Sequence, residues 1–241
     1  MDLVVIGGAA LLTAVLSAVA GLGGGVILLG VLAQFFAPTT AVPIQGAIQL
    51  MANGSRAALL RSNIAWAVVG RAAILLLPAS LLGAYVASSV PEDATRLLLG
   101  GFVLMYALRP AWLAWRGSGT IPPNALIGVG ALSGFLNTTV GASGPFTAAF
   151  FKAATASHVA FVATAATSQI FAHAAKLVAF GLQGFAIQDH LDVIAVGVAG
   201  VVAGSWIGAR LLGRISEDRL AVVFRLVLIA LGVRLLARAL L

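Results

Sequence analysis

Long apolar stretches separated by short polar turns run along the whole chain. Apolar runs of this length, about 18 residues or more, are typical of helices that cross a bilayer. The breaks between them contain turn-forming residues, as in Pro91-Glu92-Asp93 and Pro122-Pro123-Asn124. The pattern predicts apolar segments at about 3–36, 41–60, 66–89, 94–110, 124–151, 158–180, 191–213 and 219–238. We therefore expect an all-α polytopic membrane protein.

The composition agrees with this expectation, because 61% of the residues are apolar and only 9% are charged. A soluble fold of this size has to cover itself with polar groups. The net charge of +7 comes from Lys and Arg residues scattered singly near the ends of apolar segments, as in cytoplasmic loops, and not from a nucleic-acid-binding cluster. The absence of cysteine excludes disulfides and thiolate sites. We expect a multi-pass protein of the cell (inner) membrane, with lipid as a partner and no nucleic acid, metal or cofactor.

Two of the segments are too long for one span, which takes about 20 residues. Segment 3–36 is interrupted by Gly21-Leu22-Gly23-Gly24-Gly25, and segment 124–151 by Gly141-Ala142-Ser143-Gly144-Pro145. Both are predicted to be broken helices, either re-entrant or discontinuous.

The second break lies 120 residues after the first, and the same offset aligns the segments that come after the two breaks. Gln49 falls on Gln169, and the cation Arg56 falls on the cation Lys176. The chain is therefore predicted to be a duplication, with a first transmembrane repeat at 1–118 and a second at 119–241.

The distribution of cations distinguishes two topologies. If all segments span the membrane, Lys and Arg divide almost evenly between the two sides. If the two broken segments are re-entrant hairpins, one side holds Arg61, Arg71, Arg109, Arg116, Lys152, Arg210, Arg214 and Arg219, and the other holds Arg96, Arg234 and Arg238. The second arrangement follows the positive-inside rule and leaves three spans per half, so that the halves are inverted, as in many transporters.

Helices that begin at Gly23–Gly25 and at Ser143–Pro145 present free N–H groups and a positive dipole end, which together suit an anion. Arg56 and Lys176 are the only cations inside their segments and are predicted to face the same anion; the alternative is that they snorkel to the bilayer surface. Amide and imidazole groups share their helical faces. The predicted substrate-binding residues are Gly23, Gly24, Gly25, Gln49, Asn53, Arg56, Ser143, Gly144, Gln169, His173 and Lys176.

Three other interpretations are open at this point. The glycines of the breaks also suit close helix packing without any ligand. Gly141-Ala142-Ser143-Gly144 has the form of the serine motif of rhomboid-like intramembrane proteases, with His173 as a base, but the first repeat has no equivalent serine. A non-transporting membrane subunit of a larger complex is the third.

The first half resembles the sulfite exporter TauE/SafE family, also called the toluene sulfonate uptake permeases. The resemblance covers about 15–110 and is carried by Gly21–Gly25, Arg61-Ser62-Asn63-Ile64-Ala65-Trp66, Pro78 with Leu82-Gly83-Ala84, and Pro91-Glu92-Asp93 with Arg96-Leu97-Leu98. The chain departs from the family pattern at Gly30 and at Pro43-Ile44-Gln45. The resemblance implies an integral membrane carrier of sulfur oxyanions, such as sulfite, or of organosulfonates.

Overall fold

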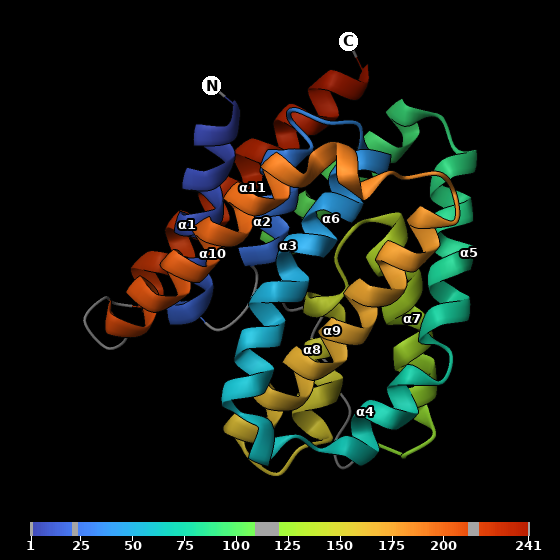
Figure 1. The fold of residues 1–241 in the computed structure, drawn as a ribbon, viewed down its shortest axis with the longest axis vertical. Coiled ribbons are helices and arrows are strands. Elements are labelled where there is room, and N and C mark those ends of the chain that lie inside the picture. The colour runs from blue at the N-terminus through green and yellow to red at the C-terminus, as the bar shows by residue number, and fades with distance from the viewer. Residues whose placement is uncertain (1, 21–23, 109–120, 212–216, 241) are drawn as a thin grey trace.

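The computed structural model (Figure 1) describes residues 2–20, 24–108, 121–211 and 217–240, and over these ranges it contains helices and no strand. The all-α prediction is confirmed. Each predicted segment corresponds to one helix or to two successive ones. The helices are α1 (Asp2–Ala20), α2 (Gly24–Leu32), α3 (Pro38–Leu59), α4 (Trp66–Ala73), α5 (Leu76–Ser89), α6 (Glu92–Leu108), α7 (Ala125–Thr139), α8 (Gly144–Ala153), α9 (His158–Gly181), α10 (Leu191–Leu211) and α11 (Glu217–Leu240), with 3₁₀ turns η1 (Arg61–Asn63) and η3 (Ile187–His190).

The predicted apolar segment at 66–89 contains two helices, α4 and α5. The chain bends there by 44° between α4 and α5. Pro78 accounts for the bend, because it has no N–H to donate to the carbonyl of Ile74 and its ring clashes with that carbonyl. α4 accordingly ends at Ala73, one residue before Ile74.

By length and composition, one helix among the described residues is able to cross a bilayer, and it runs from Ile187 to Gly208. The bent pair α4–α5 makes a second if it acts as a single span, and the apolar helices Asp2–Leu16 and Ala125–Thr139 are shorter. This is fewer than the apolar segments led us to expect. Helices α3 and α9 are long enough, but Gln, Thr and one cation in each helix, with Asn53 in α3, lower their hydropathy.

Helices far apart in the sequence pack side by side: α1 along α10, α5 along α7, α6 along α11, and α3 along α9 at the centre (Figure 1). Glycines allow the backbones to touch in these pairs. A Cβ added to Gly134 of α7 would lie 2.2 Å from the carbonyl oxygen of Leu76, and one added to Gly204 of α10 would lie 2.2 Å from that of Leu11. Close packing is therefore the role of these glycines.

The outer ends of α1 and α2 lie at the same end of the molecule. α1 runs parallel to α10, and the ring of His190, directly before α10, lies 5.8 Å from that of Phe36, which comes after α2. At the opposite end, Leu126 near the start of α7 shares an apolar cluster with Phe151 near the end of α8. α3 connects the two ends, and α9 runs antiparallel to it (Figure 1).

Candidate functional site

The polar side chains of α3 and α9 meet where these two helices cross. Gly46 on α3 makes room for Lys176 on α9, since a Cβ at Gly46 would lie 2.8 Å from the Lys176 Cδ. Further along the crossing, Arg56 and Ala166 line one cavity. The two cations predicted from the sequence therefore occupy corresponding places at opposite ends of the same crossing.

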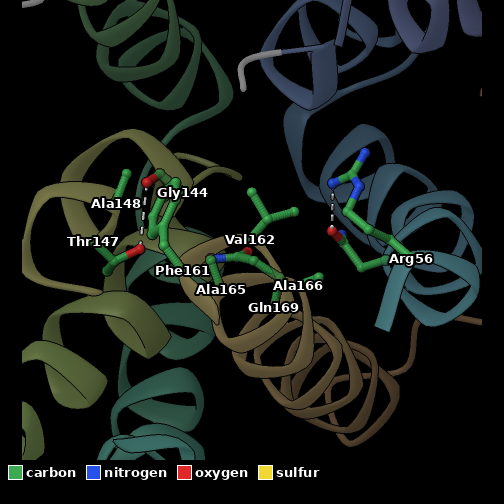
Figure 2. Close-up of a pocket in the computed structure, with 10 residues that line it drawn as sticks. Arg56, Gly144, Thr147, Ala148, Phe161, Val162, Ala165, Ala166 and Gln169 are labelled. Atoms are coloured by element: carbon green, nitrogen blue, oxygen red, sulfur yellow. Dashed lines mark hydrogen bonds between the residues drawn. The ribbon is translucent and has the colours of Figure 1, made fainter. Parts of the chain in front are cut away.

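Two small cavities adjoin α3, and the larger, which lies at the crossing with α9, has a volume of about 40 Å³ (Figure 2). Its wall comes from α3, α8 and α9, with Asn53, Arg56, Gly144, Thr147, Ala148, Phe161, Val162, Ala165, Ala166 and Gln169. In Figure 2, Arg56 lies on one side, Gly144 and Thr147 lie on the other, and Gln169 lies between them. The volume suits a few water molecules, so the cavity is nearly closed in this structure.

The smaller cavity, of about 20 Å³, lies at the start of α2. It is lined by Thr13, Ala14, Gly24, Gly25, Gln49, Ala52, Arg56, Val201 and Ser205. A Cβ at Gly25 would lie 3.2 Å from the side-chain nitrogen of Gln45 and 3.2 Å from Cδ of Gln49, so the backbone of α2 contacts both amides closely. The start of α2 thus comes close to the amides of α3.

Arg56 lines both cavities and is the only cation of the described residues to line either. Its Nη1 donates a hydrogen bond of 3.4 Å to Asn53 Oδ1, drawn as a dashed line in Figure 2. Asn53 in turn donates to the carbonyl oxygen of Gln49 at 2.9 Å. The guanidinium therefore lies between the start of α2 and the start of α8. It has five N–H donors, so the bond to Asn53 leaves it able to bind a ligand as well.

The break before α8 is held by a chain of hydroxyl groups. Ser143 is fully buried, and its Oγ lies 2.8 Å from Ser133 Oγ. Gln169 Nε2 donates to the same Ser143 Oγ at 3.3 Å. Gly141 has a φ of +77°, in the left-handed region that favours glycine, so the chain turns sharply before α8 begins. Ser143 consequently orients Gln169 at the edge of the larger cavity.

Lys176 and His173 lie on α9 but line neither small cavity. Lys176 is fully buried, so it does not snorkel. Its Nζ donates to Gln45 Oε1 at 2.9 Å and to the Gly141 carbonyl oxygen at 3.0 Å. His173 is buried as well, and its Nδ1 has no partner among the described residues. Their direct contact with an anion stays a prediction.

Gly23 lies outside the described residues. The other glycines and amides predicted for the site, with Arg56 and Asn53, line the cavities, while Ser143 supports Gln169 from behind. Gln45 is the residue that the sequence prediction missed. Its position one helical turn before Gln49, on the same face of α3, was the signal available for it.

The serine-protease interpretation requires a bond between Ser143 and His173. The described partners of Ser143 Oγ are Ser133 and Gln169 instead. The geometry is that of a buried hydroxyl network and gives no support to a serine nucleophile with a histidine base.

Comparison with known families agrees with this geometry. The family model described as Sulfite exporter TauE/SafE matches residues 6–235, nearly the whole chain. No curated protein and no solved structure matches. The chain therefore belongs to the sulfite exporter TauE/SafE family, and it is a multi-pass membrane transporter and not an enzyme.

Proposed function

We propose that this transporter carries small sulfur-containing oxyanions, sulfite or organosulfonates, across the inner membrane, and that the anion binds around Arg56. The observation that carries the proposal is that Arg56 lines both small cavities, one at the start of α2 and one at the start of α8. A guanidinium presents several donors in a plane and suits an oxyanion.

The groups around Arg56 complete a site for an anion. The helix starts at Gly24 and Gly144 contribute N–H groups and a positive dipole end. Gln49, Asn53 and Gln169 contribute amides. Among the described residues no Asp or Glu lines either cavity, so no negative charge opposes the ligand. Gly23, Ser143, His173 and Lys176 complete the predicted site.

The apolar residues that line the larger cavity help to define which substrates it can accept. Phe161 and Val162 line this cavity, together with the alanines of α8 and α9. Such a wall tolerates a short organic group attached to a sulfonate as well as an inorganic anion. The small volume requires that the cavity opens before either is bound.

We further propose that the chain consists of two inverted repeats, 1–118 and 119–241, each starting with a re-entrant hairpin. The boundary lies outside the described residues. The arrangement is supported by the ends of α1–α2, which lie together near His190, and by the ends of α7–α8, which lie together at the opposite end of the molecule. The equivalent positions Gln49 and Gln169 each line one cavity.

The proposal is tested by ligand screening and flux. Purified protein is screened by thermal shift with sulfite, sulfate, short sulfonates and carboxylates, and uptake of the stabilising anions is then measured in proteoliposomes. We expect stabilisation and saturable flux with sulfite or a sulfonate. Flux of none of these sulfur anions, in protein that remains folded, would refute the proposed function.

A further inference from the structure

A third cavity, much larger and polar, lies at the end of the molecule where α3 begins and α9 ends. Its volume is about 320 Å³, and Thr39, Thr40, Phe180, Gln183, Asp189 and His190 are among the residues that line it. We call it the vestibule. These residues are separate from the anion site around Arg56.

The contact between Lys176 and Gln45 lies between the vestibule and the cavities around Arg56. On α9, Gln169 lines the larger Arg56 cavity and Phe180 lines the vestibule, with Lys176 between them on the same helical face. On α3, Thr40 lines the vestibule, Gln49 lines the smaller Arg56 cavity, and Gln45 lies between them. An anion that moved along the α3–α9 crossing from the vestibule to the Arg56 cavities would therefore meet the contact between Lys176 and Gln45.

The contact also connects the two helix breaks. Gln45 Nε2 donates to the Gly25 carbonyl oxygen at 3.3 Å, and Gln45 Oε1 accepts from Lys176 at 2.9 Å. Lys176 then donates to the Gly141 carbonyl oxygen at 3.0 Å. One lysine and one glutamine thus join the start of α2 to the turn before α8 by three hydrogen bonds.

The described acceptors of the Lys176 amine are neutral. Both are carbonyl oxygens, and the described salt bridge of the chain joins Arg96 to Glu92 elsewhere. A buried ammonium without a counter-charge is costly, and an oxyanion is a stronger acceptor than a neutral carbonyl. An anion that arrives from the vestibule is therefore able to displace Gln45 and Gly141 from Lys176.

We propose that Lys176 and Gln45 form a gate between the vestibule and the Arg56 cavities, and that the transported anion opens it by taking over the hydrogen bonds of the Lys176 amine. The proposal rests on the proposed function, because it requires an anionic substrate. It makes Gln45 a positioning residue that holds the closed state and gives Lys176 a transient contact with the anion.

The test uses cysteine labelling, for which the natural chain has no background thiol. A single cysteine at Ala52 reports on the smaller Arg56 cavity, and one at the exposed Thr39 reports on the vestibule. A membrane-impermeant anionic methanethiosulfonate reagent is added from the vestibule face of oriented vesicles, without substrate. Gln45→Ala should speed labelling at position 52 by roughly tenfold, the order of change expected when a hydrogen bond to a charged donor is lost. Labelling at position 39 should not change.

Gln45→Glu provides the opposite change at the same position. A carboxylate gives Lys176 a permanent counter-charge, so labelling at position 52 should stay slow and anion flux should fall, while anion binding in detergent persists. Lys152→Gln, at an exposed lysine at the end of α8, should match the unaltered protein in both assays.

Equal labelling rates at position 52 in Gln45→Ala and the unaltered protein would overturn the gate, as would full flux in Gln45→Glu. Because labelling needs no substrate, the labelling result is independent of the proposed function, whereas the flux result depends on it. Absence of sulfur-anion flux in the unaltered protein would refute the function alone.

Discussion

Arg56 of α3 and Gln169 of α9 line the same cavity, although they come from opposite halves of the chain. Gln49, the predicted counterpart of Gln169 in the first half, lines the other small cavity, again with Arg56. The counterpart of Arg56 itself, Lys176, is bonded instead to Gln45 and to the backbone of Gly141. The two cations that the predicted repeat pairs thus differ in their surroundings: Arg56 lines the cavities, and Lys176 bonds to protein groups.

Substitutions at Ser143 test whether this residue supports the anion site through Gln169 or acts as a nucleophile. Ser143→Ala removes the acceptor of Gln169 Nε2 and should weaken anion binding by about 0.5–1.5 kcal/mol, as for one neutral hydrogen bond. Ser143→Gly, which imitates the first repeat, should behave in the same way or more mildly. Binding is measured by titration calorimetry. Covalent reaction of Ser143 with a fluorophosphonate probe would contradict this role.

The hairpin topology predicts which sites label from a common side. Single cysteines at Asp2, at the start of α1, and at Thr39, in the first turn of α3 after α2, should react with an impermeant reagent added to one face of the membrane. Cysteines at Asn124 and Ala156, both exposed beyond the ends of α7–α8, should react only from the other face. Labelling of positions 2 and 39 from different faces would refute the re-entrant first segment.

Two glycines of α7 allow a matched test of helix packing. A Cβ at Gly130 would lie 1.7 Å from the backbone oxygen of Ala72, whereas one at Gly128 would meet nothing within 4 Å. Gly130→Ala should therefore reduce the free energy of unfolding by about 1–3 kcal/mol or more, the usual effect of overpacking. Gly128→Ala is the control and should not destabilise. Thermal unfolding in one detergent compares them, and equal midpoints would show that α7 and α4 are less closely packed than described.

Much of the fold can be predicted from the sequence, because apolar runs and turn residues are local signals. The helix α3, predicted at 41–60, is found at Pro38–Leu59, and α9, predicted at 158–180, is found at His158–Gly181. The bend between α4 and α5 was not predicted, because the apolar residues on both sides of Pro78 gave one uninterrupted apolar segment.

The site was predictable only in part. The offset between the repeats identified Gln49, Gln169 and Arg56, all of which line the cavities. The bridge through Gln45 was not predictable, because Gln45 aligns with Ala165 in the second half and the repeat signal is absent there. Its role depends on the distance between α3 and the turn at Gly141, which only the tertiary structure provides.

The central claim is that Arg56 binds the transported anion, and sulfite binding to Arg56→Gln tests it most directly. The control is Arg61→Gln, which removes the same charge from an exposed position at the start of η1. Titration calorimetry in detergent should show that Arg56→Gln weakens binding by about 1.5–3 kcal/mol, the range for a hydrogen bond to a charged group. Arg61→Gln should bind sulfite as the unaltered protein does. Unaltered affinity in folded Arg56→Gln would contradict the account.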